Sequence, residues 1–377
     1  MDIQAALLRE TSTPFQIETI QLESPRTNEV QVQIVGVGIC HTDVKMAEGY
    51  RPMPLPVVLG HEGAGIVTAV GANVTKVKPG DAVVLSFNSC GHCDNCQSGH
   101  PSTCDDVGPL SFSCERPEDG SSPLSQDGAK VSGYFFGQSS FATHAITTER
   151  NVVKVPDDVL GDVLGDGPDL NTLALLGPLG CGIQTGAGAV LNALQVEAGS
   201  TLAVFGTGSV GLSAVMAGVI AGASMIIAID LNEKRLALAV ELGATHTLNP
   251  TTTSDLVATV KDICGGKGAH YSLDTTNVPS VVRQAVDCLR IRGSYGHVGG
   301  AGTEITLSTS TLLFGRTMIG IVQGDSIPDI FIPRLIALYR AGQFPFDKLV
   351  TFYAFEEINR AVDEMHEGKC VKPVLLV

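Results

Sequence analysis

The sequence predicts an α/β protein in which a β-rich region is joined to a parallel sheet with helices between its strands. Two successive patterns along the 377 residues support this fold class. Residues 1–180 read as short apolar stretches broken by Gly and Pro, which is typical of a barrel or sandwich. From about residue 200, apolar strands alternate with helical stretches, as in the βαβ units of a doubly wound sheet.

The β-rich region contains four clear strand candidates separated by turn signals. They are IQAALL at 3–8, EVQVQIVGVGI at 29–39, GAGIVTAV at 63–70 and DAVVLSF at 81–87. Turn signals such as Glu23-Ser24-Pro25 and Lys78-Pro79-Gly80-Asp81 lie between them. The stretch 111–130 is rich in Ser, Gly, Pro and acidic residues, so we expect an exposed loop there.

The second region predicts the strands and helices of a nucleotide-binding sheet. The strand candidates are TLAVF at 201–205, MIIAID at 225–230, HYSLDT at 270–275 and GSYGHVG at 293–299, with a helix near 278–290. The last segment predicts helices at 331–342 and 356–368 and a closing strand at 371–377. We therefore expect one domain from residues 1–182 and 323–377, with a nucleotide-binding domain, 183–322, inserted between its parts.

Charge and composition exclude several classes of partner. The chain has 24 Lys and Arg against 39 Asp and Glu, a net charge of −15, so its average field repels nucleic acid and anionic lipid. It contains no run of eighteen apolar residues, and its first residues, MDIQAALLRE, lack the pattern of a signal peptide. We expect a cytoplasmic protein without nucleic-acid or membrane partners, whose ten cysteines are metal ligands or buried thiols.

A glycine-rich turn predicts a dinucleotide site. Gly206, Gly208 and Gly211 follow the strand TLAVF and precede a helix, which is the context of the Rossmann fingerprint. Asp230 stands nineteen residues after Gly211, where it can accept hydrogen bonds from a ribose and repel a 2′-phosphate. The pattern favours NAD over NADP, although a plain βα turn and an ordinary helix cap are the alternatives for the glycines and for Asp230.

Four cysteines close together predict a structural metal site. Cys90, Cys93, Cys96 and Cys104 can close a tetrahedron around zinc and leave no open position for a substrate. An iron–sulfur run would place its fourth cysteine after three residues and before Pro, whereas here the gap is seven residues and Asp105 follows. A zinc ribbon that binds nucleic acid would need two separate cysteine pairs and a basic surface.

Three further residues are candidates for a second metal site. Cys40, His61 and Cys181 each flank glycines in apolar stretches. Each one alone is more often a buried thiol or a core histidine, and spacing does not join them.

A resemblance joins them. The segment GHEGAGIVTAVGANVTKVKPGDAVV, at 60–84, resembles the zinc-site signature of the zinc-containing alcohol dehydrogenases of the medium-chain dehydrogenase/reductase superfamily. The similarity extends over essentially the whole chain and implies a GroES-like catalytic domain with a Rossmann domain. The segments 176–194 and 331–359 look most like the aryl (benzyl) alcohol dehydrogenases.

The resemblance implies a role for each matching residue. Cys40, His61 and Cys181 would hold a catalytic zinc ion whose fourth position is open to water or the alcohol. Glu62 would be the nearby carboxylate, and Asp43 would orient the ligating histidine. The remaining implied roles are a proton-relay hydroxyl (Thr42), a structural zinc site (Cys90, Cys93, Cys96, Cys104) and an NAD site (Gly206, Gly208, Gly211, Asp230, Arg235, Thr185, His41, Lys372).

The chain departs from the family pattern at two positions. Many members carry a histidine three residues after the relay hydroxyl, where this chain has Lys45, which is mostly protonated at neutral pH and a poor base. His41 replaces a cationic residue that touches the pyrophosphate in some members, so we expect weaker NAD binding near neutral pH.

We expect a homodimer or homotetramer with two zinc ions per chain that oxidises a primary, aryl or allylic alcohol to an aldehyde with NAD. The alternatives are a zinc-free quinone or enoyl reductase, a glutathione-dependent formaldehyde dehydrogenase and a non-catalytic scaffold. Phe87, Phe135 and Phe136 are candidates for the substrate wall, with ordinary core packing as the other interpretation.

Overall fold

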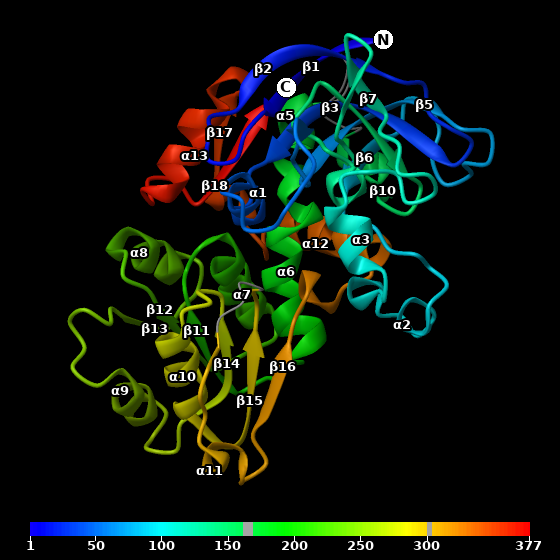
Figure 1. The fold of residues 1–377 in the computed structure, drawn as a ribbon. Coiled ribbons are helices and arrows are strands. Elements are labelled where there is room, and N and C mark those ends of the chain that lie inside the picture. Colours follow the sequence, from blue (N-terminus) through cyan, green and yellow to red (C-terminus); the bar gives the residue numbers. More distant parts are fainter. Residues whose placement is uncertain (161–168, 300–303) are drawn as a thin grey trace. The chain divides into compact units, whose positions relative to one another are not determined.

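The computed structural model describes residues 1–160, 169–299 and 304–377, which form two compact units (Figure 1). The first unit comprises Met1–Cys181, Ile327–Ile336 and Val350–Val377, and the second comprises Gly182–Ser326 and Ala337–Leu349.

The first unit is built on two sheets. One has the strand order β4-β1-β2-β7-β8 and the other β10-β6-β5-β3-β18-β17, with β9 also paired to β3. Its strands are β1 (Asp2–Leu8), β2 (Gln16–Leu22), β3 (Glu29–Gly38), β4 (Val57–Val58), β5 (Gly63–Val70), β6 (Ala82–Leu85), β7 (Leu124–Gln126), β8 (Ala129–Val131), β9 (His144–Thr148), β10 (Val152–Lys154), β17 (Val350–Ala354) and β18 (Lys372–Leu376). Its helices are α1 (His41–Ala47), α2 (Asp94–Gln97), α3 (Val107–Phe112), α4 (Asp157–Leu160), α5 (Leu170–Leu176) and α13 (Ile358–His366).

The four predicted strands of this unit are confirmed as β1, β3, β5 and β6, and the closing strand is confirmed as β18. Strand β3 pairs with β5, β9 and β18, and nearly all of its residues are buried. A central strand covered on both faces needs apolar residues at successive positions, which is why its second half, IVGVG, reads as an uninterrupted apolar run.

The prediction of an exposed loop at 111–130 is wrong in part. The segment contains β7 and the start of β8, and the side chain of Arg116 is fully buried. Its guanidinium donates to Glu29 Oε1 at 2.7 Å and Oε2 at 3.1 Å and to Glu23 Oε2 at 2.9 Å. Polar composition indicated exposure, but buried charges are stable when they are paired and hydrogen-bonded.

The second unit is a six-stranded parallel sheet with the order β13-β12-β11-β14-β15-β16. Its strands are β11 (Thr201–Phe205), β12 (Met225–Ile229), β13 (His246–Leu248), β14 (Ala269–Asp274), β15 (Leu289–His297) and β16 (Thr317–Gly320). Its helices are α6 (Gly182–Gly188), α7 (Ser209–Ile220), α8 (Glu233–Glu241), α9 (Leu256–Ile263), α10 (Pro279–Asp287) and α11 (Thr309–Leu312). Every predicted strand and helix of this region is confirmed.

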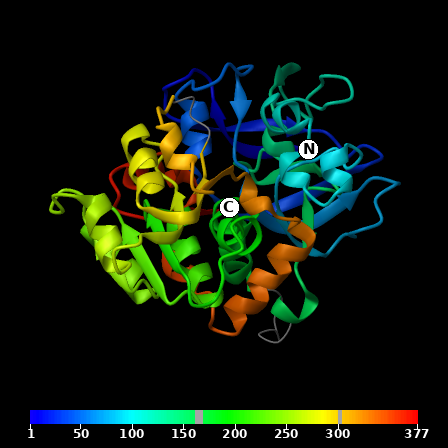
Figure 2. The ribbon, with the colours of Figure 1, turned by 90° about the horizontal axis from the view of Figure 1, so that it is seen from below.

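Alternating side chains of β11 and β12 cover the two faces of this sheet. Ala203, Phe205, Ile227 and Ile229 share one core cluster with apolar residues of α9 and α10. Leu202 and Ile226 instead point to the opposite face, where they lie against Gly218 of α7. Helices on both faces make this a doubly wound sheet (Figures 1 and 2). The order reverses between β11 and β14, and such a switch point forms a ligand crevice at the carboxyl ends of the strands.

The unit limits differ from the predicted domains near the C-terminus. Residues 337–349 belong to the second unit, although the prediction placed all of 323–377 in the first domain. Helix α12 (Pro328–Arg340) begins in the first unit and ends in the second. After it, Phe344 and Phe346 are fully buried and Lys348 pairs with Glu241 of α8. Burial of these two phenylalanine side chains therefore determines that residues 337–349 pack with the second unit.

Within the described ranges no single helix is long and apolar enough to cross a membrane. One pair of helices with a bend between them, Leu170–Gly180 and Gly182–Ala193, reaches the length and apolar composition of a membrane span only when the two are taken together.

Candidate active site and metal centres

A cluster of four side chains, three buried and one (Cys40) partly buried, lies in the first unit. The ligand atoms of Cys40, His61, Glu62 and Cys181 all lie within 4.8 Å of one another. Cys40 follows β3 and caps α1, while His61 and Glu62 precede β5. Cys181 follows a short 3-10 turn, Gly177–Gly180. The fold thus joins three segments that are far apart in the sequence.

Glycine makes this convergence sterically possible. A Cβ on Gly38 would lie 2.1 Å from Glu62 Oε2, and one on Gly177 would lie 2.4 Å from the carbonyl oxygen of Glu62. The Gly38 N–H donates to that same carbonyl at 3.0 Å, and the Ser86 hydroxyl donates to the Gly180 carbonyl at 2.8 Å. Close backbone approach therefore fixes the segment that carries Cys181.

The ring of His61 is oriented by a buried carboxylate. Its Nδ1 lies 2.9 Å from Asp43 Oδ1, and Asp43 also accepts the Gly60 and Cys40 N–H groups at 3.0 Å each. Burial alone would lower the pKa of His61, but Asp43 raises it well above the ordinary value. Nε2 of His61 is buried and has no hydrogen-bond partner within the described part of the chain. The ring therefore presents one buried, unused nitrogen.

The two thiols of the cluster share a hydrogen bond. A hydrogen bond with Cys181 is the main reason that the pKa of Cys40 falls well below its ordinary value. The same bond raises the pKa of Cys181 well above its ordinary value, so the pair favours one thiolate and one thiol. Two sulfurs, an unused imidazole nitrogen and a nearby carboxylate fit zinc by donor type. A carboxylate behind the ligating histidine is also the arrangement that zinc sites use.

Lys372 belongs to this cluster in the structure. Its Nζ lies 3.0 Å from Glu62 Oε1, 2.9 Å from Oε2 and 3.0 Å from the Ile39 carbonyl. Burial raises the pKa of Glu62, and the ammonium of Lys372 acts against that rise. Burial would lower the pKa of Lys372, but the negative groups beside it raise it, so this side chain stays cationic. Its donors are directed at Glu62 and Ile39.

Helix α1 carries the remaining predicted residues of this region. Thr42 is partly buried in its first turn and His41 is exposed. Lys45 is also exposed, with 58% of its side chain accessible, and it pairs with Glu48 at 2.9 Å.

Three neighbours of His61 differ in how far the sequence indicated them. Phe136, a predicted wall residue, stacks on the His61 ring with centroids 4.4 Å apart, and Phe135 meets that ring edge-on at 5.5 Å. Gln138 was missed, although its Nε2 donates to the His61 carbonyl at 3.1 Å and to the Ser86 carbonyl at 3.0 Å. Its Oε1 also accepts the Gly63 N–H and the Ser140 hydroxyl, and no motif marks a glutamine whose function is to join such distant segments.

The four-cysteine loop forms a second cluster. The sulfurs of Cys90, Cys93, Cys96 and Cys104 all lie within 4.8 Å of one another. Backbone N–H groups point at them, with Cys93 N 3.3 Å from Cys90 Sγ and Cys90 N 3.3 Å from Cys104 Sγ. Gly91 has a φ of +77°, which favours glycine in this turn. Four convergent sulfurs with N–H donors fit a closed zinc site.

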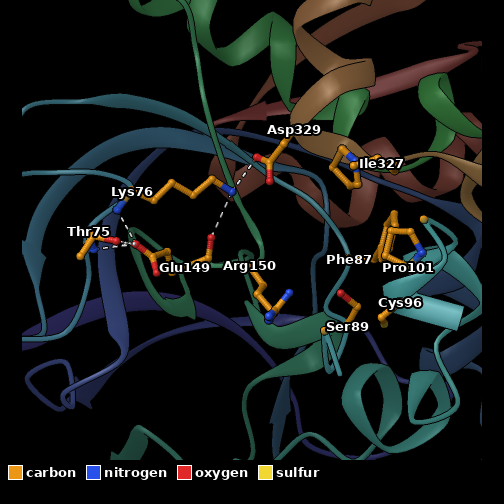
Figure 3. Close-up of a pocket in the computed structure, with 13 residues that line it drawn as sticks. Thr75, Lys76, Phe87, Ser89, Cys96, Pro101, Glu149, Arg150, Ile327 and Asp329 are labelled. Atoms are coloured by element: carbon orange, nitrogen blue, oxygen red, sulfur yellow. Dashed lines mark hydrogen bonds and ion pairs between the residues drawn. The ribbon is translucent and has the colours of Figure 1, made fainter. Parts of the chain in front are cut away.

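A cavity of about 440 Å³ lies beside this loop (Figure 3). Lys76 Nζ lies 2.6 Å from Asp329 Oδ1, and Glu149 Oε1 accepts the Thr75 N–H at 2.6 Å. Phe87, a predicted substrate-wall residue, lines this cavity, whereas Cys40, His61 and Cys181 do not. We therefore do not assign the reaction to it.

The glycine-rich turn follows β11 and Asp230 follows β12, so these predicted cofactor residues lie at the carboxyl edge of the sheet. Gly206 has a φ of +87°, and a Cβ on Gly211 would lie 1.8 Å from the Gly206 carbonyl oxygen. A Cβ on Gly208, which caps α7, would meet nothing within 4 Å. Nε of Arg235 is buried without a hydrogen-bond partner in the described ranges, and Thr185 is buried in α6.

Comparison with known proteins defines the class. The chain matches the alcohol dehydrogenase GroES-like domain over residues 26–157 and the zinc-binding dehydrogenase family over residues 209–338. It is 47% identical over 376 residues to a geraniol dehydrogenase of Castellaniella defragrans, covering 99% of this chain and 97% of that protein.

Two solved structures share the whole fold. A crystal structure of an alcohol dehydrogenase zinc-binding domain protein from Burkholderia ambifaria has a TM-score of 0.93 and 46% identity, and it covers 100% of this chain and 99% of its own. A benzyl alcohol dehydrogenase from Acinetobacter calcoaceticus has a TM-score of 0.92 and 43% identity, with the same coverage. The chain belongs to the zinc-containing alcohol dehydrogenases of the medium-chain dehydrogenase/reductase superfamily. It is accordingly an oxidoreductase.

Proposed function

We propose that the protein catalyses the reversible, NAD-dependent oxidation of a primary aryl or allylic alcohol to an aldehyde at the Cys40, His61 and Cys181 cluster. The observation that carries the proposal is the buried Nε2 of His61, which has no hydrogen-bond partner in the described part of the chain and lies beside two hydrogen-bonded sulfurs. Such an atom is costly to bury unless it binds something, and a metal ion is the ligand that this donor set fits.

Each residue of the cluster has a distinct task. When bound by Cys40, His61 and Cys181, zinc supplies Lewis acidity that makes the alcohol easier to deprotonate. Asp43 holds the His61 ring so that Nε2 faces the thiols. Lys372 neutralises the buried Glu62 carboxylate. This contact supports Lys372 better as the partner of Glu62 than as a pyrophosphate contact.

The Thr42 hydroxyl accepts the proton of the alcohol. Its place in the first turn of α1, two residues from Cys40, supports this role. Lys45 cannot take over the family's histidine relay in its charged state, because an ammonium has no lone pair. Lys45 pairs with Glu48 instead, so the proton leaves Thr42 by another route.

NAD binds at the glycine-rich turn of the second unit. The open space at Gly208 and the N-terminus of α7 suit a pyrophosphate, and the Asp230 carboxylate suits an adenosine ribose. Arg235, Thr185 and His41 are the further candidate contacts.

The substrate class follows from the site and its relatives together. Geraniol and benzyl alcohol are both primary alcohols, with the hydroxyl-bearing carbon next to a double bond or an aromatic ring. Phe136, which stacks on His61 and is not completely buried, places an aromatic ring beside the cluster, and such a ring suits a flat apolar substrate.

A panel of alcohols assayed with NAD and NADP, with zinc counted per chain, tests the proposal. We expect turnover of benzylic and allylic primary alcohols with NAD and two zinc ions per chain. His61→Ala should lose turnover and one zinc ion, whereas His246→Ala, at an exposed histidine, should retain both. Normal turnover by His61→Ala would instead favour a zinc-free reductase, and a requirement for glutathione would favour a formaldehyde dehydrogenase.

We also propose that copies of the chain assemble into a homodimer or homotetramer in the cytoplasm. Support for assembly comes from β16, an edge strand, and from Leu312, Leu313 and Phe314 before it, which are all exposed. Support for the cytoplasm comes from the ten cysteines, none of which forms a disulfide.

A further inference from the structure

Thr207 is a fully buried threonine inside the glycine-rich turn, and the mechanism above gives it no role. The parallel pairing of β11 with β12 sets Phe205 opposite Ile229, and the Gly206 N–H donates to the Ile229 carbonyl at 2.8 Å. The residues that follow the two strands, Thr207 and Asp230, therefore meet at the carboxyl edge of the sheet.

The contacts between them fix the Asp230 carboxylate. Oδ2 accepts the Thr207 N–H at 2.6 Å and the Thr207 hydroxyl at 2.9 Å, while Oδ1 accepts the Asn232 N–H at 2.8 Å. Rotation of the carboxylate would break bonds at both oxygens. A buried hydroxyl needs a partner, and here the partner is the residue expected to select the cofactor.

The neighbourhood explains why a fixed carboxylate matters in this chain. Asn232 caps α8 by accepting the N–H groups of Lys234 and Arg235, so a guanidinium stands in the first turn after Asp230. An arginine near this position accommodates the 2′-phosphate of NADP, whereas the carboxylate repels it. The two side chains oppose each other in cofactor choice, and the outcome depends on where the carboxylate is held.

We propose that Thr207 is a positioning residue for cofactor specificity. Its hydroxyl holds Asp230 Oδ2, so the second lone pair of Oδ1, beside the Asn232 bond, is left to accept from the ribose of NAD, and the negative charge stays where a 2′-phosphate would lie. The proposal rests on the proposed NAD-dependent function and adds the residue that makes Asp230 effective.

Dissociation constants for NADH and NADPH, measured by nicotinamide fluorescence, test it. Thr207→Val keeps the shape but removes the hydroxyl, so it should weaken NADH binding about tenfold without weakening NADPH binding, as expected for one hydrogen bond to a charged group. Thr207→Ser should restore both values. Thr259→Val, which removes the hydroxyl bond from Thr259 to the Asp255 carbonyl elsewhere in the unit, is the matched control.

A double variant separates positioning from plain structural support. In an Asp230→Ala background, Thr207→Val should add no further loss of NADH affinity if Thr207 acts through Asp230. Equal weakening of NADH and NADPH, or unchanged preference in Thr207→Val, would overturn the proposal. If the wild-type protein prefers NADPH, the proposed use of NAD and this inference are both wrong. If the wild-type protein prefers NADH and Thr207→Val keeps the same preference, only the role of Thr207 is wrong.

Discussion

Asp43 shows how one buried residue determines the chemistry of another. Its carboxylate holds His61 Nδ1 and the N–H groups of Gly60 and Cys40, so it aligns two of the proposed zinc ligands together. We predict that Asp43→Asn lowers the affinity of the catalytic site for zinc by about 10- to 100-fold, as loss of such a partner does in other zinc sites. Zinc counts after dialysis against a chelator measure the effect.

Asp255 provides the control for this prediction, because its carboxylate caps α9 in the second unit. Asp255→Asn should keep the wild-type zinc count at every chelator concentration. Unchanged zinc retention in Asp43→Asn would show that the backbone alone aligns His61.

Arg116 is a buried cation whose removal should destabilise the first unit. It is the cationic partner of Glu29, a buried carboxylate that also accepts the Tyr134 hydroxyl at 2.9 Å. Arg116→Met should cost about 3–5 kcal/mol of unfolding free energy, because Glu29 would remain buried without a countercharge. The double variant Arg116→Met/Glu29→Gln should recover part of that loss.

Urea unfolding followed by circular dichroism measures both variants. Arg26, which pairs with the exposed Asp119, supplies the comparison, since Arg26→Met should cost less than about 1 kcal/mol. Equal losses in Arg116→Met and Arg26→Met would contradict the view that burial makes the difference.

At the level of single residues, the sequence indicated best those sites whose spacing is local. Cys90 and its three partners lie within fifteen residues, so their pattern alone predicted a zinc site. Cys40, His61 and Cys181 meet only through the pairing of β3 with β5 and the turn at Gly180, so no local spacing joins them and the resemblance had to. Arg116 and Gln138 bind partners that are distant in the sequence, and no pattern marked them.

At the level of elements, apolar periodicity predicted the strands well because burial determines it. The whole of β11 is buried, and its predicted and observed limits agree at Thr201–Phe205. Packing after a helix is harder to predict, because Phe344 and Phe346 could be buried against either unit. Their sequence gives no preference, which is why the limit near residue 337 was missed.

The glycines of the α7 turn provide a prediction at this scale. Gly211→Ala would place a methyl group 1.8 Å from the Gly206 carbonyl oxygen and force α7 away from β11. The thermal unfolding midpoint of this variant should therefore fall by several degrees. Gly208→Ala meets nothing within 4 Å and has a negative φ of −73°, so its stability should be unchanged. If the pyrophosphate approaches Gly208 closely, this second variant should still lose NADH affinity.

Calorimetry and NADH titration of the two variants separate packing from cofactor contact. Gly80→Ala, at a first-unit turn with open space but a φ of +94°, calibrates the cost of backbone conformation alone. Wild-type NADH affinity in Gly208→Ala would contradict close approach of the pyrophosphate at this residue.

At the level of the whole molecule, we propose that the edge strand β16 is the site of self-association. An unpaired edge beside exposed apolar side chains is prone to pair with another copy, and the accessible fractions of Leu313 and Phe314 are 69% and 57%. We predict that Leu313→Asp combined with Phe314→Asp shifts the particle mass from an oligomer to a monomer in light scattering, because the charges could not be buried in a shared interface. Val240→Asp, at an equally exposed apolar position on α8, should leave the mass unchanged. If the double variant is still an oligomer, the interface does not include β16. If the wild-type protein is a monomer, the proposed assembly is wrong.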